Sequence, residues 1–256
     1  MATPASALQQ FEQTKPLQRF RVEVAISPAA RLQCYQLRYE VFATELGAEV
    51  RGTEPGIDKD RFDEHCTHLA VFDNKTNEIV ATTRLLDNRG RKAIGKFYSE
   101  TEFDISAILQ AGKAYLEIGR TCIHPHYRRG AALPMLWQGI ARYVVEHDID
   151  YLFGCASIPL AHGNKYINSV MVHLRGKHFS APDLRARPLI PLRLESDGPL
   201  ADDVILPTLL KAYLRQGAVI CGEPYWDAGF GVADVFVLLQ SDQIANRYVK
   251  HFIDRI

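Results

Sequence analysis

A basic turn lies between a predicted strand and a predicted helix, and it contains Arg128, Arg129, Gly130 and Ala131. The N-terminus of a helix carries unpaired N–H groups and the positive end of the helix dipole, so it favours an anion. Two arginines add charge there, and glycine lets the backbone approach a ligand closely. The pattern predicts a phosphate site, such as one for a pantetheine carrier. A solvated basic turn before a core helix accounts for the same residues equally well.

Acids and arginines also recur inside segments predicted to be regular and in the loop after the first helix. These charged candidates are Arg38, Asp60, Asp63, Arg84, Glu117 and Arg120. Guanidinium groups bind carboxylates through paired hydrogen bonds, and a buried carboxylate needs a partner. We expect a charged network that holds the first helix and the following loop over a pocket. The alternative is that an arginine binds substrate.

Histidine and cysteine residues are the remaining candidates. His65, Cys66 and His68 are of types that bind zinc, but no second group of ligands has the usual partner spacing. We therefore expect no metal, and expect these side chains to pack or to hydrogen-bond near the pocket. Cys122 ends an apolar strand, where a thiol is usually inert, so we expect no covalent intermediate on it.

The composition excludes several classes of protein. The chain has 256 residues, 47% hydrophobic and 23% charged, which is typical of a globular protein with a core. Its formal net charge is zero, which gives no support for nucleic-acid binding. The five cysteines form no CxxC pair, which favours a reducing compartment. Without a signal-like segment or a run of 18 apolar residues, we expect a cytoplasmic protein, and peripheral contact with the inner membrane face stays open.

Hydrophobic periodicity predicts the elements that position the candidates. Strands are predicted at 21–26, 67–73, 79–86, 114–121, 150–155 and 233–239. Helices are predicted from the N-cap Ser27 and Pro28 to about Gly47, from about Ala131, and at 97–112, 164–174, 206–215 and 242–252. Residues 87–90 are expected to close a strand, and 187–191 to be extended.

The order of these elements favours a mixed α/β sheet with helices on both faces. We expect a flexible leader at 1–19, a core at 20–180 and a C-terminal extension at 181–256 packed on that core. The apolar segments of the extension would cover a tunnel or a pocket, or would form ordinary core.

Taken in order along the chain, the motifs resemble the GNAT superfamily of acyltransferases. The strand, basic turn and helix at 117–132 are similar to its acyl-carrier site, although Tyr127 stands where the superfamily usually has Arg or Gln. The motifs Arg38-x-x-x-Phe42, Asp60-x-x-Asp63 and Glu117-x-x-Arg120, with Arg84 at a strand end, resemble the acyl-homoserine-lactone synthases. Ala48 replaces the tryptophan of those synthases.

Segments 62–69, 96–104 and 209–214 resemble a sister family, the N-acyl amino acid synthases that include L-ornithine Nα-acyltransferases. The resemblance implies a GNAT fold: a mixed, mostly antiparallel central sheet flanked by helices, with an added C-terminal α/β region. It implies transfer of a 3-hydroxy fatty acyl group from acyl carrier protein to the α-amine of L-ornithine or a similar amino acid, for aminolipid synthesis. CoA thioester is the alternative donor, and no cofactor is expected to stay bound.

The resemblance also implies a role for each candidate. Glu117 would take the proton of the amine, directly or through water. The catalytic set would be completed by Arg38, Arg84 and Arg120. Substrates would contact Phe42, Asp60, Asp63, Thr121, Cys122 and Ile123, with a backbone N–H near 121–123 polarising the thioester. The basic turn would hold the phosphate of the carrier. A free acid among Asp60, Asp63 and Glu100 would meet the second amine of ornithine.

Alternatives remain at this point. Glu117 would otherwise form a salt bridge with one of the three arginines. A basic cluster would dock an acidic carrier protein or form a solvated turn, and it comprises Arg89, Arg91, Lys92 and Lys96. Nucleic-acid binding lacks the expected mixture of basic and aromatic residues. An acyl-homoserine-lactone synthase, another CoA-dependent GNAT enzyme and a carrier-binding module without turnover are the rival functions.

Overall fold

One large twisted sheet organises the molecule. The computed structural model describes residues 19–50, 54–194 and 204–242. The sheet order is β1 (Phe20–Val24), β2 (Thr67–Asp73), β3 (Ile79–Asp87), β5 (Tyr115–Ile123), β6 (Tyr151–Pro159), β10 (Val232–Gln240) and β8 (Val219–Ile220), with β9 (Tyr225–Asp227) also on β10. The neighbours are antiparallel except for β5 and β6. The expected mixed, mostly antiparallel sheet is confirmed.

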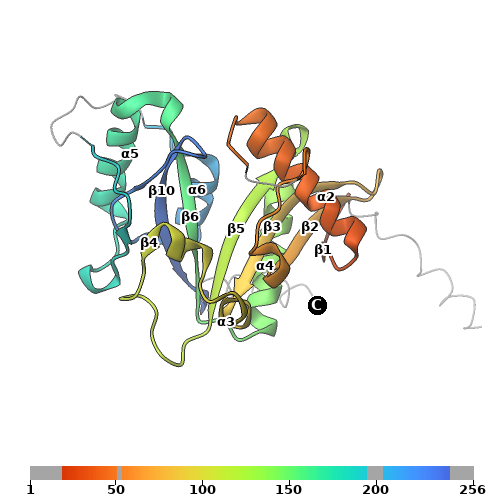
Figure 1. Cartoon of the computed structure of the whole chain (residues 1–256), viewed down its shortest axis with the longest axis horizontal. Coiled ribbons are helices and arrows are strands. Elements are labelled where there is room, and N and C mark those ends of the chain that lie inside the picture. Colours follow the sequence, from red (N-terminus) through yellow and green to blue (C-terminus); the bar gives the residue numbers. More distant parts are fainter. Residues whose placement is uncertain (1–18, 51–53, 195–203, 243–256) are drawn as a thin grey trace, which may run out of the picture.

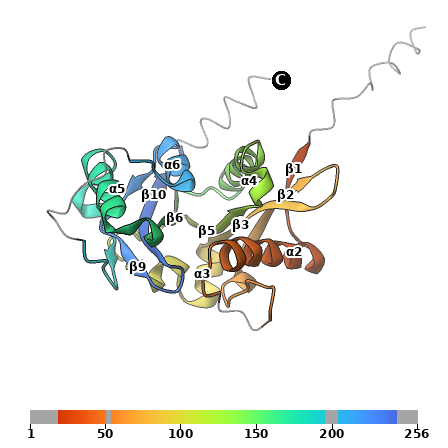
Figure 2. The same cartoon turned by 90° about the horizontal axis from the view of Figure 1, so that it is seen from above.

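Helices cover both faces of this sheet. They are α2 (Pro28–Tyr39), α3 (Asn88–Ile94), α4 (Ala132–Glu146), α5 (Gly163–Lys177) and α6 (Thr208–Arg215). Figure 2 shows α4 and α6 on one face and α2 on the other. Shorter pieces are a π-helix at Glu40–Glu45, 3₁₀ turns at Asp63–His65, Tyr98–Thr101, Pro125–Tyr127, Leu160–His162 and Pro182–Leu184, and a two-stranded sheet of β4 (Phe103–Asp104) and β7 (Arg187–Pro188).

Alternating side chains of β2 explain the two layers. Leu69 and Val71 belong to the apolar core that includes α4, whereas Ala70 and Phe72 pack in the core under α2. A strand that is buried on both faces favours a continuous apolar run, which β2 has from Leu69 to Phe72. Helix α2 begins as predicted, because the Ser27 hydroxyl accepts a hydrogen bond from Ala30 N (3.1 Å).

Two neighbouring strands, β5 and β6, separate at the centre of the sheet. Strands β5 and β6 pair over only three residues, the last pair being Glu117 and Phe153. Beyond that pair the two strands diverge (Figure 1). Gly154 lies at the point of divergence, where an added Cβ would stand 2.3 Å from the Ile118 carbonyl oxygen. The backbone edges that β5 and β6 turn toward each other therefore have no strand partner past Glu117.

Several predictions need correction. Residues 97–112 are not a helix: the Glu100 carboxylate turns back to accept from Phe97 N (2.7 Å), which closes a 3₁₀ turn, and β4 follows. Residues 87–90 end β3 as expected, but they also begin a helix that was not predicted, because Asp87 caps α3 by accepting from Gly90 N (2.9 Å). The helix expected at 242–252 and the leader at 1–19 fall almost wholly outside the described residues.

The segment expected as a C-terminal extension contributes to the main sheet. Strand β10 pairs with β6 along nine residues, and β8 and β9 pair with β10. The boundary at residue 180 stays a prediction. Over the described ranges of the chain, no helix combines the length and the apolar character needed to cross a bilayer.

Candidate active site

Three arginines and three aspartates form a buried cluster beside the centre of β5, named here the arginine cluster. Its members are Arg38, Asp58, Asp60, Asp63, Arg84 and Arg120. Arg38 donates to both oxygens of Asp63 (2.7 and 3.1 Å) and to Asp58 (3.0 Å). Arg84 Nη1 lies 2.7 Å from Asp60 and 3.2 Å from Asp63. The expected network is confirmed for the three arginines, Asp60 and Asp63 but not for Glu117, and Asp58 is a member that sequence reasoning missed.

The three arginines differ in whether a guanidinium nitrogen is left without a hydrogen-bond acceptor. Arg38 is 1% exposed and directs all of its guanidinium nitrogens at aspartates, so its geometry is that of a structural residue. Arg84 keeps a buried Nη2 without a hydrogen-bond partner among the described residues. Gly119 leaves room for the Arg84 side chain, because an added Cβ at residue 119 would stand 3.4 Å from Arg84 Nε. Arg84 therefore retains a donor for a ligand.

Arg120 lies on an irregularity of β5. The pairing of β3 with β5 shifts register between Thr82 and Arg84, and Arg120 has a φ of 50°, which is uncommon for a residue with a side chain. Its guanidinium carbon lies 5.0 Å from the ring of Tyr98 and 4.8 Å from that of Phe230. Phe42 of the π-helix packs edge-on against Phe230 at 5.9 Å. Aromatic rings thus enclose the exposed side of the arginine cluster.

Glu117 is held by the turn that was expected to be helix. Its carboxylate accepts from Tyr98 N (2.7 Å), Ser99 N (2.6 Å) and Ser99 Oγ (2.5 Å). The alternative of a salt bridge with an arginine is wrong, because no arginine in the described chain lies within ion-pair distance. Burial raises the pKa of Glu117, although these hydrogen bonds oppose the rise.

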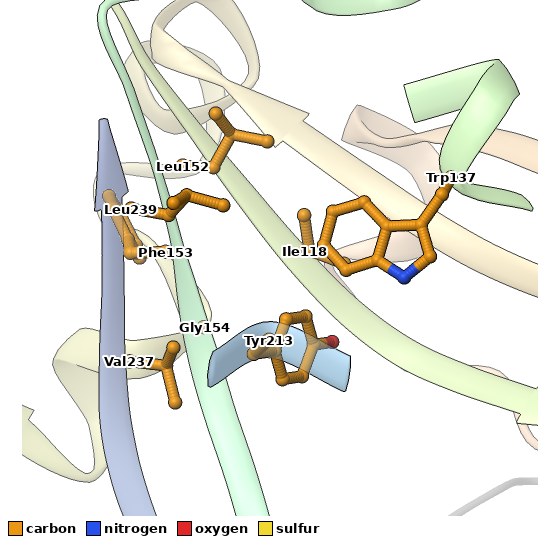
Figure 3. A pocket seen from close by; sticks show the side chains of 8 residues that line it. All are labelled: Ile118, Trp137, Leu152, Phe153, Gly154, Tyr213, Val237 and Leu239. Atoms are coloured by element: carbon orange, nitrogen blue, oxygen red, sulfur yellow. The ribbon is translucent and has the colours of Figure 1, made fainter. Parts of the chain in front are cut away.

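The opposite face of the divergence is apolar. A narrow slot there is lined by Ile118, Trp137, Leu152, Phe153, Gly154, Tyr213, Val237 and Leu239. Figure 3 shows Trp137 of α4 and Tyr213 of α6 beside Ile118 of β5, and their rings meet edge-on at 5.6 Å. The parting of β5 and β6 therefore lies between an apolar slot and a charged region.

The basic turn lies at the far end of β5 and enters α4. Arg128 is engaged by Glu45 of the π-helix in two hydrogen bonds (2.6 and 2.5 Å), and it also donates to Ile123 O (3.2 Å). Arg129, Gly130 and Ala131 are exposed. A phosphate at this turn would meet Arg129 directly and would compete with Glu45 for Arg128.

The second basic cluster lies at the other end of β5. Asn88, the first residue of α3, accepts from Tyr115 N (2.9 Å), so α3 adjoins the start of that strand. A nine-residue strand spans about 30 Å. Arg89 pairs with Asp87 (3.1 Å) and Arg91 with Glu100 (2.9 Å). Three of its four residues lie in α3, two of them are paired with acids, and the cluster is remote from the basic turn, which argues against carrier docking there.

The side chains of Thr121, Cys122 and Ile123, later in β5, lie in different surroundings. Cys122 is packed among core side chains under α2, and burial raises the pKa of its thiol well above the usual range. Ile123 belongs to the core on the α4 face, so these two could meet a substrate only through their backbone. Thr121 Oγ1 lies 2.7 Å from Thr83 Oγ1.

Two of the three suspected metal-binding residues pack or hydrogen-bond inside the protein, as expected. His68 Nε2 lies 3.1 Å from the carbonyl oxygen of Asp63, and burial lowers the pKa of its ring. Cys66 packs in the core, where burial raises the pKa of its thiol to about 12. His65 is exposed.

A group that the sequence did not predict comprises Glu102, Asp227 and Asp234, named here the carboxylate cluster. One oxygen from each lies within 4.8 Å of the others. By contrast, the acids expected to meet a second amine are already paired: Asp60 and Asp63 with arginines of the cluster, and Glu100 with Arg91. Their contact with a second amine stays a prediction. Asp234, a charged residue inside the apolar run 233–239, was the available signal.

Comparisons with known proteins agree with this geometry. A family model described as an acetyltransferase (GNAT) domain matches residues 37–138. L-ornithine N(alpha)-acyltransferase of Brucella abortus is 34% identical over 253 residues, covering 90% of this chain and 88% of the relative. The enzyme of the same name from Rhodobacter capsulatus is 32% identical over 239 residues, covering 86% and 90%.

Two solved structures share the fold. A CoA-dependent acyl-homoserine lactone synthase, BjaI, solved with SAM and isopentyl-CoA, has a TM-score of 0.56 at 11% identity and covers 91% of this chain and 88% of its own. The synthase LasI has a TM-score of 0.50 at 14% identity, with 87% and 90% covered. The GNAT fold expected from the sequence is thereby confirmed.

Proposed function

Because the chain belongs to the L-ornithine Nα-acyltransferase family of GNAT proteins and is therefore an acyltransferase, we propose that it moves a 3-hydroxy fatty acyl group from acyl carrier protein to the α-amine of L-ornithine or a similar amino acid, for aminolipid synthesis. One observation carries the proposal: β5 and β6 part at Glu117, with an apolar slot on one face and charged groups on the other. An acyl donor and an amino acid acceptor need these two environments.

The donor arm would lie along the divergence. Past Glu117 the facing edges of β5 and β6 have no strand partner, so their backbone groups are available to a pantetheine amide. The acyl chain would enter between Trp137 and Tyr213, and these two side chains would have to move apart because the slot between them is narrow. The phosphate would bind at Arg128, Arg129, Gly130 and Ala131 before α4, as the sequence predicts.

The reaction is a direct transfer. The neutral amine attacks the thioester carbonyl carbon, a C–N bond forms, the C–S bond breaks and the thiol leaves with a proton. A backbone N–H near residues 121–123 would stabilise the developing oxyanion. Glu117 would accept the amine proton directly or through water, and its raised pKa suits that task.

The acceptor carboxylate would meet arginine. Arg84 is the better candidate, because its Nη2 is buried without a partner in the described chain. Arg120 lies beside it and faces Tyr98 and Phe230. Arg38 would act by holding α2 and the 58–63 loop in place through Asp58 and Asp63.

A product assay tests the proposal. Purified protein is incubated with 3-hydroxyacyl carrier protein or 3-hydroxyacyl-CoA and a panel of amino acids, and products are identified by mass. We expect N-acylornithine, formed faster from the carrier protein. Acylation of S-adenosylmethionine instead would indicate the lactone-synthase alternative, and acylation of none of the amino acids would refute the proposal.

A further inference from the structure

The carboxylate cluster of Glu102, Asp227 and Asp234 is assembled from three separate segments. Glu102 follows the turn that holds Glu117, Asp227 ends β9, and Asp234 lies in β10 opposite Ser157 of β6. Glu102 and Asp234 are 4% and 5% exposed, so two carboxylates are almost wholly withdrawn from water. Such groups need a partner, because an unpaired buried charge is costly.

The partners available within the cluster are too few. Asp234 accepts from Ser157 Oγ (2.7 Å) and Asp227 from Phe230 N (3.1 Å). Cys155 and Tyr98 lie beside the Glu102 carboxyl, but its Oε2 has no hydrogen-bond partner among the described residues. Within the described part of the chain, no lysine or arginine forms an ion pair with any of the three acids. Burial first, and then the charge of Asp234, raises the pKa of Glu102 to about 8, and burial raises that of Asp234 to about 6.

The cluster adjoins the reaction centre. Ser99 Oγ donates to Glu117 and lies 3.5 Å from Cys155 Sγ. Burial and then the charges of Glu102 and Asp234 raise the pKa of Cys155 well above its usual value, so this thiol borders the cluster. On the other side of Tyr98 and Phe230 lies Arg120. Arg120 and the carboxylate cluster thus both adjoin the segments of Tyr98 and Phe230, and the Tyr98 segment also holds Glu117.

We propose that Glu102, Asp227 and Asp234 bind the side-chain ammonium group of the acceptor and so select a dibasic amino acid over its neutral homologue. The inference rests on the proposed function, in which an amino acid is acylated at its α-amine. An ammonium that donates at about 2.8 Å in tetrahedral directions spans acceptor oxygens about 4.6 Å apart. The oxygens of the cluster lie within 4.8 Å of one another, which accommodates that geometry. The same ion would supply the missing partner of Glu102.

The test compares two acceptors that differ only in the terminal amine, L-ornithine and L-norvaline. Acylation by the carrier-protein donor is measured as kcat/KM for the full chain and for Glu102→Gln, Asp234→Asn and Asp227→Asn. We expect the preference for ornithine to fall about 10- to 100-fold in each variant. Norvaline acylation should stay within about threefold of wild type, because the shared α-amine chemistry is untouched. Asp104→Asn, an exposed acid two residues from Glu102, is the matched control and should leave both values unchanged.

Other outcomes overturn the inference. An equal loss with both acceptors would assign the cluster to the common machinery or to folding, and an unchanged preference would remove it from acceptor selection. Loss of ornithine acylation on chelation, restored by Mg²⁺ or Ca²⁺, would identify a divalent-cation site instead. Asp227 is only half-buried, so its variant serves if the buried variants do not fold. If wild type acylates neither acceptor, the proposed function fails, and calorimetric binding of L-ornithine against L-norvaline still decides the role of the cluster.

Discussion

The arginine cluster and the carboxylate cluster are both buried on the side of the sheet that carries Glu117, yet their charges are balanced differently. The first sets three guanidinium groups against three aspartates, with Arg38 and Asp63 joined by two hydrogen bonds. The second sets three acids together without a basic partner in the described residues. The pKa of Asp63 is held well below its usual range by the nearby arginines despite burial, whereas that of Glu102 is raised to about 8. Balanced buried charge maintains a structure, whereas unbalanced buried charge is suited to a ligand.

The largest effect is expected at Glu117, between the two clusters. Glu117→Gln keeps an acceptor for Tyr98 N and Ser99 N but cannot take a proton. We expect turnover to fall about 10²- to 10⁴-fold with donor binding retained, measured by product mass and by calorimetry. A variant with wild-type turnover would remove Glu117 from the mechanism.

The second-largest effect is expected when the arginine cluster loses one of its negative charges. Asp63→Asn would leave Arg38 and Arg84 short of a buried counter-charge. The free energy of unfolding in urea should fall by about 3–5 kcal/mol. Asp60→Asn is the control, because Asp60 is 23% exposed and its loss should cost about 1 kcal/mol. Similar losses in the two variants would contradict the structural role of Asp63.

The pH dependence of stability should have opposite signs in the two clusters. A raised pKa means that the folded protein holds the proton of Glu102 more tightly than the unfolded chain does. This contribution to stability is complete below the ordinary value of 4.5 and is lost as pH rises through about 8. Asp63, with its lowered pKa, contributes at neutral pH and loses its contribution in acid.

Thermal and urea unfolding from pH 5 to 8.5 would separate these effects. Wild type should lose about 4 kcal/mol more than Glu102→Gln over this range in the absence of ligand. Saturating L-ornithine should reduce the difference, because a bound ammonium stabilises the ionised cluster. If the free energy of unfolding changes with pH in the same way in both proteins, ionisation of the cluster does not destabilise the fold.

The smallest effect is expected at the exposed pair Arg128 and Glu45. Replacing Arg128 with Ala removes one donor to the carrier phosphate, and the KM for the acyl carrier should rise about tenfold with kcat little changed. The variant Glu45→Gln frees Arg128 and should lower this KM. If Arg129→Ala alone raises the KM, the phosphate lies on Arg129 and Arg128 serves only to hold the π-helix.

Periodicity predicted the strands and the long helices because burial governs both. The pattern 67–73 and the apolar run 233–239 became β2 and β10 nearly residue for residue. Where local hydrogen bonds decide instead, prediction failed: Glu100 closes a turn at 97–101, and Asp87 starts α3. The charged motifs of the arginine cluster were found because they are close in sequence or share a family pattern.

The carboxylate cluster could not be found in that way. Glu102 and Asp234 are 132 positions apart in the printed sequence, and they meet only because β10 pairs with β6 and places Asp234 opposite Ser157. Ser99 and Tyr98 were missed as partners of Glu117 for a related reason, since backbone N–H donors carry no signature in residue type.

The parting of β5 and β6 has a consequence for how the whole molecule is held together. In the part of the sheet that the structure describes, β5 and β6 join the strands on their two sides through three residue pairs. A thioester arm that binds in that gap would contact both β5 and β6. Its binding free energy would therefore add to the stability of the folded protein. The resistance of this enzyme to unfolding would then report how much acylated carrier the cell holds.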